Sequence, residues 1–187
     1  MIDENEMLAT LEDTVRRLEE LGIPYMVTGS FAMSTYATAR TTMDIDIVVE
    51  IGTVDPQAIE AKFRPDYYVD AESICLAKQH QTMFNMLNRA NGVKVDCILR
   101  KKNRFELERF ERRRRASLGG VEFWSISKND LILSKLRWEK DSHSEVQFRD
   151  IQGLVGEGES DIAAEVRREG LGEVWNAYIE WTIRAKK

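Results

Sequence analysis

The sequence contains few of the residues that define specialised classes of protein. Its 187 residues include two cysteines, two histidines and three prolines. Cys75 and Cys97 have no cluster of further Cys or His around them, so they give neither a disulfide framework nor a zinc-ligand spacing. His80 and His143 support no Ser-His-Asp nucleophilic site. We expect a protein of a reducing compartment.

Long apolar runs are also absent. The uninterrupted apolar stretches span a few residues each, whereas a transmembrane helix needs roughly 20. The N-terminal residues MIDENE are acidic, while a secretory signal has a basic start and then a continuous apolar stretch. These features predict a soluble, cytoplasmic protein without a membrane partner.

Positive charge does not dominate the chain. Because 27 Lys and Arg stand against 32 Asp and Glu, the formal net charge is −5, which argues against coating nucleic acid through bulk positive charge. A local basic groove stays compatible with this total. At 43% hydrophobic residues, the chain is long enough for one buried core, or one core with a small second lobe.

Hydrophobic periodicity predicts a mixed α/β (α+β) part followed by a helical part. Residues 24–28 and 43–51 have the pattern of strands, and Gly29-Ser30 forms a turn into a short helix over 31–37. We predict a core over residues 1–126 and a helical lobe packed on it over 127–187. The other predicted strands are 82–87, 93–99 and 121–126, and the other predicted helices are 8–21, 57–63, 71–79, 105–112, 127–139, 144–155, 160–169 and 171–183.

Three aspartates stand in segments otherwise suited to burial. Asp44 and Asp46 lie two apart on a predicted strand, so their side chains point to the same side. Two carboxylates at that range repel unless a cation lies between them, which suits a hard divalent metal with oxygen ligands. Asp96 would join them if strand 93–99 lies beside strand 43–51. The ordinary alternative is that each aspartate is solvated or caps a turn.

The Gly29-Ser30 turn would offer backbone N–H groups and the positive end of a short helix, which suits a phosphate. Together, Gly29-Ser30, the Asp44-Ile45-Asp46 element and the distal Asp96 resemble the motif of the nucleotidyltransferase superfamily of DNA polymerase beta. Residues 127–136 with 147–151 also resemble motifs of AbiE-type toxin nucleotidyltransferases and their small relatives. The resemblance covers residues 24–155 and implies the polymerase-beta-like fold.

The resemblance also implies roles for single residues. Asp44, Asp46 and Asp96 would hold Mg²⁺ or Mn²⁺, with Asp96 also helping to activate the acceptor, while Gly29 and Ser30 hold the triphosphate. Lys135 would contact phosphate, and Asp150 would orient it or a base. The alternatives are a lysine whose stem covers the core and an ion pair between Asp150 and Lys135 or an arginine.

A basic run occupies residues 100–115. Its nine basic and three acidic residues give 9 − 3 = +6, so it could attract a polyanion, although such runs are often solvated helix faces. Arg40, just before the aspartate pair, is a candidate for contact with a triphosphate or acceptor phosphate. Trp124, Trp138, Trp175 and Trp181 are interpreted as core or lobe-packing residues, and the alternative is that one of them stacks on a base.

The predicted function is transfer of a nucleoside monophosphate from an NTP to a hydroxyl acceptor. By resemblance, the setting is a toxin-type enzyme acting on RNA, such as a tRNA 3′ end, and restrained by an antitoxin. Protein and small-molecule acceptors stay open. The alternative is a non-catalytic nucleotide-binding or protein-interaction module that retains the fold, and the presence of all three aspartates argues against it.

Overall fold

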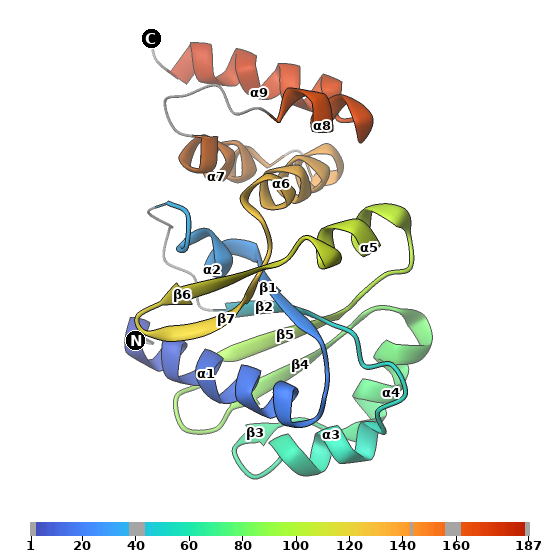
Figure 1. Ribbon diagram of the computed structural model, residues 1–187. Coiled ribbons are helices and arrows are strands. Elements are labelled where there is room, and N and C mark those ends of the chain that lie inside the picture. Colours follow the sequence, from blue (N-terminus) through green and yellow to red (C-terminus); the bar gives the residue numbers. More distant parts are fainter. Residues whose placement is uncertain (1–2, 38–43, 143, 156–161, 186–187) are drawn as a thin grey trace.

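The computed structural model describes residues 3–37, 44–142, 144–155 and 162–185 (Figure 1). Its strands form one seven-stranded sheet in the order β3-β4-β5-β2-β1-β7-β6, with parallel and antiparallel pairs. The predicted mixed α/β class is therefore confirmed. The strands are β1 Tyr25–Thr28, β2 Asp44–Val49, β3 Tyr67–Tyr68, β4 Met83–Asn88, β5 Lys94–Leu99, β6 Arg114–Leu118 and β7 Val121–Ser125.

Helices lie on both sides of the sheet. Figure 1 shows α1, α3 and α4 on one side, and α6 to α9 gathered on the other. No described helix is long and apolar enough to cross a bilayer. The helices are α1 Glu4–Glu20, α2 Gly29–Met33, α3 Pro56–Phe63, α4 Ala71–His80, α5 Arg104–Glu111, α6 Lys128–Ser142, α7 Glu145–Val155, α8 Ala163–Arg168 and α9 Gly172–Ala185.

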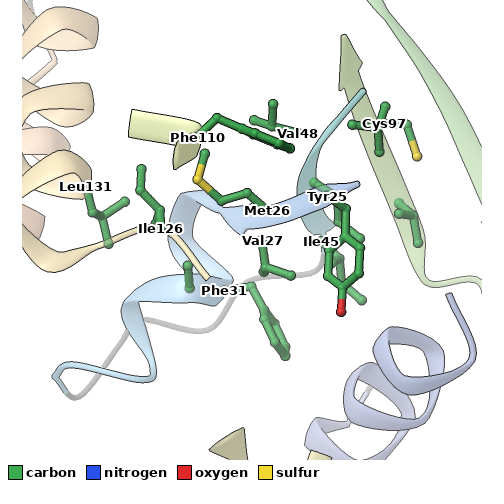
Figure 2. Close-up of a cluster of buried hydrophobic side chains, with 14 of the residues drawn as sticks. Tyr25, Met26, Val27, Phe31, Ile45, Val48, Cys97, Phe110, Ile126 and Leu131 are labelled. Carbon is green, nitrogen blue, oxygen red and sulfur yellow. The ribbon is translucent and has the colours of Figure 1, made fainter. Parts of the chain in front are cut away.

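The apolar core is continuous from the sheet into the helical part. Figure 2 shows Ile126 and Leu131 on the side of β1 where the Met26 side chain lies, and the Ile126 N–H donates to the Val27 carbonyl. All four side chains are buried. Because β2 and β5 are covered on their apolar face, Ile45, Ile47, Val95 and Cys97 are fully buried there. The opposite face of the same two strands carries the aspartates, which fixes the candidate site on the side of α5 and α6.

Two strands have no counterpart in the sequence prediction. β3 has two residues, too few for a periodic signal. β6 begins with Arg114 and Arg115, and such charged residues look like a continuation of the preceding helix. The signal that marks it is Gly119-Gly120, whose two residues have positive φ and connect β6 to β7 as a hairpin.

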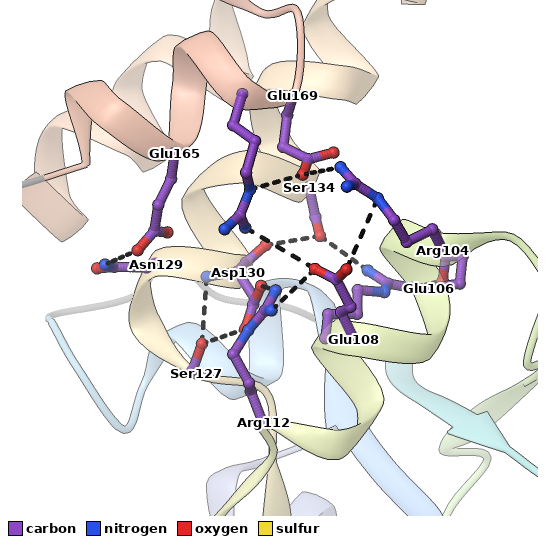
Figure 3. Close-up of polar contacts among 12 residues, drawn as sticks. Arg104, Glu106, Glu108, Arg112, Ser127, Asn129, Asp130, Ser134, Glu165 and Glu169 are labelled. Carbon is purple, nitrogen blue, oxygen red and sulfur yellow. Dashed lines mark hydrogen bonds and ion pairs between the residues drawn. The ribbon is translucent and has the colours of Figure 1, made fainter.

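Ion pairs to two buried carboxylates connect the helical part to the core. The Glu169 carboxylate, 4% exposed, accepts from Arg104 of α5, Arg137 of α6 and Arg168 of α8. Figure 3 shows Arg104 beside Glu169, and Arg112 beside Asp130. The Arg112 guanidinium lies 2.6 Å from the buried Asp130 carboxylate. These contacts hold α5 and α6 in fixed positions over the aspartate face of the sheet.

Candidate active site

The structure brings the three predicted aspartates onto one face of the sheet. β2 and β5 pair in parallel, and Asp46 lies beside Asp96 in the register. On its other side Asp46 lies beside Thr28 of β1, the residue directly before Gly29. Asp44, two residues before Asp46, shares its face. The strand pairing that the sequence left conditional is thus present, and the carboxylates converge next to the Gly-Ser turn.

The surroundings of Asp46 disfavour its charged form. Burial, and then the negative charges of Asp96 and Asp44, raise the pKa of Asp46 from 3.8 to about 6. Asp96 is 7% exposed, and its buried Oδ1 has no hydrogen-bond partner in the structure. A buried carboxylate oxygen without a partner is costly, since it has lost water and gained nothing in exchange. The cluster therefore favours a cation.

Lys94 supplies one positive charge to this cluster, and the sequence prediction missed it. Its Nζ lies 3.0 Å from Oδ2 of Asp96 and 3.9 Å from Oδ2 of Asp44. The hydrogen bond to Asp96 raises the pKa of Lys94. The sequence does contain a signal for Lys94. It stands two residues before Asp96 on the same strand, and side chains two residues apart on a strand point to the same face.

Gly29 lets the turn approach the aspartates. Its φ of +66° lies in the left-handed region, and a Cβ atom at this position would stand 2.0 Å from Oδ2 of Asp46. Only glycine allows both the backbone conformation and the approach. Ser30 follows at the start of α2 and lines the same cleft.

Replacing Gly29 by alanine is expected to destabilise the protein and to impair the site. The left-handed backbone costs an alanine about 1 kcal/mol, and displacement of the Asp46 carboxylate adds about 1 to 2 kcal/mol. Gly22→Ala is the matched control, because Gly22 has φ +65° and nothing within 4 Å of its added Cβ. Chemical unfolding of both variants measures the difference. Equal losses of stability would contradict the steric argument.

Lys135 and Asp150 form a buried ion pair. Nζ of Lys135 donates to Oδ2 of Asp150 at 2.6 Å, and the side chains are 7% and 5% exposed. The helices α6 and α7, which pack against each other, carry the two groups. The ion pair that the sequence left as an alternative is therefore present. Lys135 also borders the cleft, and its positive charge lowers the pKa of Asp46.

A cleft of about 600 Å³ joins these features. Its lining includes six of the predicted site residues, namely Gly29, Ser30, Asp44, Asp46, Asp96 and Lys135. Trp138 of α6 also borders the cleft and is 65% exposed, which corrects its interpretation as a packing residue. Trp124, Trp175 and Trp181 are partly buried against the core, as expected. Arg40 lies outside the described residues.

Much of the basic run has partners within the fold. Arg113 lies over the rings of Phe110 and Trp124. Five other arginines pair with carboxylates: Arg100 with Glu50, Arg104 with Glu108 and Glu169, Arg109 with Glu106, Arg112 with Glu108 and Asp130, and Arg115 with Glu19 and Glu122. Six of the nine basic residues thus have partners within the fold, while Lys101, Lys102 and Arg114 are exposed.

No ready-made metal centre is present in the described part of the chain, since no three Asp, Glu, His or Cys side chains there are arranged to hold an ion as they stand. Instead, the Lys94 ammonium lies within ion-pair distance of Asp44 and Asp96. The donor set itself, three carboxylates with one orphaned buried oxygen, is of the hard oxygen type that Mg²⁺ and Mn²⁺ prefer.

No family model and no curated protein matches the chain. Solved structures do match it. The solution structure of the antibiotic-resistance factor ANT(2″)-Ia matches with a TM-score of 0.58 and 10% identity, covering 98% of both chains. A putative nucleotidyltransferase from Thermotoga maritima matches with a TM-score of 0.54 and 16% identity, over 80% of this chain and 94% of that one.

The lincosamide antibiotic adenylyltransferase LnuA, in a lincomycin-bound structure, matches with a TM-score of 0.50 and 15% identity, over 82% of this chain and 96% of that one. At such identities the likeness concerns the fold. These three structures share the fold of this chain over most of their length. The chain therefore has the nucleotidyltransferase fold that the Gly-Ser and Asp-x-Asp elements predicted.

Proposed function

We propose that this chain is a metal-dependent nucleotidyltransferase, which moves a nucleoside monophosphate from an NTP to a hydroxyl acceptor. The observation that carries the proposal is the convergence of Asp44, Asp46 and Asp96 beside the Gly29-Ser30 turn. They lie in one cleft of a chain with the nucleotidyltransferase fold. A likeness of fold alone would also suit a non-catalytic module, whereas the convergent carboxylates favour catalysis.

The three carboxylates would hold Mg²⁺ or Mn²⁺. The orphaned Oδ1 of Asp96 and the raised pKa of Asp46 both indicate a cluster short of positive charge. When bound, the ion offsets negative charge on the phosphoryl oxygens and the leaving pyrophosphate, and it makes an acceptor hydroxyl more acidic.

In the proposed reaction the acceptor oxygen forms a bond to the α-phosphorus, and the bond from that phosphorus to the pyrophosphate oxygen breaks. Asp96 accepts the hydroxyl proton or orients the hydroxyl that loses it. The backbone N–H groups of the Gly29-Ser30 turn and the Ser30 hydroxyl bind the triphosphate. Lys135 contributes positive charge to phosphate, and Asp150 positions its ammonium. Arg40 is a further candidate for phosphate contact.

Two classes of acceptor are proposed. An RNA acceptor, a toxin role, an antitoxin partner and the AbiE-type relationship rest on sequence motifs alone. A small hydroxylated acceptor is favoured by a specific observation: six of the nine basic residues of the run have partners within the fold, which leaves less positive charge for a polyanion. The neighbours ANT(2″)-Ia, in complex with adenylyl-2″-tobramycin, and lincomycin-bound LnuA are structures with such molecules. We favour the small-molecule acceptor.

Labelled transfer tests the proposal directly. The protein is incubated with each α-labelled NTP and Mg²⁺, in parallel with total cellular RNA and with a panel of hydroxylated small molecules, alongside Asp46→Ala. Label that enters one acceptor class with the native chain and not with the variant is the expected result. Equal incorporation by both would show that the metal site is misassigned.

Thermal stability separates the enzyme from the non-catalytic module. The protein is melted with NTP plus Mg²⁺ and with NTP plus chelator. The enzyme is expected to gain stability from the nucleotide only with the metal, because binding to the folded state raises its stability. An equal gain in chelator would favour a nucleotide-binding module without metal chemistry.

A further inference from the structure

Among the residues that the structure describes, Lys94 is the cation that the sheet itself places beside the aspartates, and the proposed reaction gives it no role. In the register of β2 and β5 it lies beside Asp44, and it precedes Asp96 by two residues on β5. It therefore shares the face of both carboxylates, with Nζ 3.0 Å from Oδ2 of Asp96 and 3.9 Å from Oδ2 of Asp44. One ammonium thus serves two of the three predicted ligands.

The oxygens that Lys94 occupies are among those that a divalent ion would need. Asp96 is nine-tenths buried and offers two oxygens: Oδ2 accepts from Lys94, and Oδ1 has no partner in the structure. An ion bound by Asp44 and Asp96 would stand within a few ångströms of the ammonium, where two positive charges repel strongly in a partly buried site. The two cations therefore compete for the same negative charge, even where they contact different oxygens of Asp96.

Lys94 has room to withdraw. Its side chain is 37% exposed, and its four-carbon stem is flexible. Its partner across the β4–β5 pair, Leu87, is also exposed, so the face of the sheet on that side is open. Lys135, the other cation that lowers the pKa of Asp46, is instead buried and tied to Asp150. Of these two lysines, Lys94 is the one that can move.

We propose that Lys94 is a positioning residue that acts as an internal counter-cation: it holds Asp44 and Asp96 together in the metal-free protein and leaves them when a divalent ion binds. This inference rests on the proposed metal site. Its consequence is competition. Part of the attraction between the carboxylates and the metal replaces an ion pair that already exists, so Lys94 weakens metal binding and keeps the empty site folded.

Direct Mn²⁺ binding, measured by the electron paramagnetic resonance signal of the free ion, tests whether Lys94 and the metal compete for the carboxylates. Lys94→Met removes the charge and keeps the length of the side chain, and Lys94→Arg keeps the charge. Lys94→Met is expected to bind Mn²⁺ roughly fivefold or more tightly than the native chain, while Lys94→Arg stays close to it. Unchanged or weaker binding by Lys94→Met would overturn the proposal.

Lys62→Met is the matched control, because Lys62 is 36% exposed and pairs with Glu20 outside the cleft. It is expected to leave Mn²⁺ binding unchanged. Thermal melting gives a second readout: Lys94→Met should lower Tm in chelator, and saturating Mn²⁺ should remove the difference from the native chain. A loss of Tm that Mn²⁺ does not restore would indicate an ordinary structural ion pair.

Asp46→Asn separates this inference from the proposed function. If the native chain binds Mn²⁺ and Asp46→Asn does not, the proposed metal site is supported. The Lys94 variants then test whether the metal displaces the Lys94 ammonium. If the native chain and Asp46→Asn bind Mn²⁺ equally weakly, the metal site fails, and the Lys94 proposal fails with it.

Discussion

Replacing Asp46 by asparagine is expected to abolish nucleotidyl transfer and to make the metal-free protein more stable. Transfer should fall by about a thousandfold or more, because an amide lacks the negative charge that holds a divalent ion. Without the ion, the negative charge on the reacting phosphate is not stabilised. Stability should rise because the substitution removes a buried charge that Asp96 and Asp44 repel. Function and stability would then change in opposite directions.

The gain in stability depends on pH with a defined sign. The pKa of Asp46 is about 6 in the folded protein and 3.8 as an ordinary aspartate, so between these values the folded chain binds the proton more tightly. The penalty for the charged form is therefore complete above pH 6 and disappears as the pH falls toward 4. Allowing for screening by solvent, we expect Asp46→Asn to gain about 1 to 2 kcal/mol at pH 7.5.

Denaturant unfolding in chelator at pH 7.5 and pH 4 measures this dependence. Asp44→Asn provides the comparison, because its side chain is 49% exposed and water screens its charge. It should lose transfer as Asp46→Asn does, with a smaller gain in stability. An Asp46→Asn variant no more stable than the native chain at pH 7.5 would contradict the electrostatic account.

Replacing Lys135 by methionine is expected to destabilise the protein by about 3 to 5 kcal/mol. The substitution removes one partner of a buried ion pair and leaves the Asp150 carboxylate charged in a place that water barely reaches. The double variant Lys135→Met/Asp150→Leu should recover most of the loss, since two apolar side chains can replace a buried pair at little cost. Lys140→Met, an exposed lysine on the same helix, should change stability little.

The double variant also tests the role of Lys135 in the cleft. If Lys135 contacts phosphate, the refolded double variant should keep a raised KM for NTP or a lowered kcat despite its restored stability. A double variant with native kinetics would leave the pair with a structural role alone. A double variant as unstable as Lys135→Met would instead contradict the expected compensation.

Local patterns predicted the elements that depend on near neighbours in the chain. The period of two in Asp44-Ile45-Asp46 places both carboxylates on one face, and the turn at Gly29-Ser30 links a strand to a helix. The same patterns did not reveal β6, whose charged start resembles a helix. They also misassigned Trp138, because helical spacing does not show which side of a helix the rest of the chain covers.

Contacts between distant segments decided the rest. The basic run appears as a positive surface in sequence, yet Arg112 and Arg104 pair with Asp130 and Glu169, which later helices supply. The net charge of a segment is a sum over its residues and takes no account of their partners. In the fold, each charged side chain interacts mainly with the groups that lie within a few ångströms of it. The net charge of −5 therefore carries little information about any one face.

The sequence by itself determined which chemistry is available: three carboxylates in strands, a glycine-serine turn and a later lysine. The tertiary structure alone decided that Asp96 lies beside Asp46, that Gly29 must lack a side chain because Asp46 fills its space, and that Lys94 stands between two of the carboxylates. The physical reason is that periodicity fixes the direction of a side chain within its own strand or helix. Pairing of strands fixes which side chains meet.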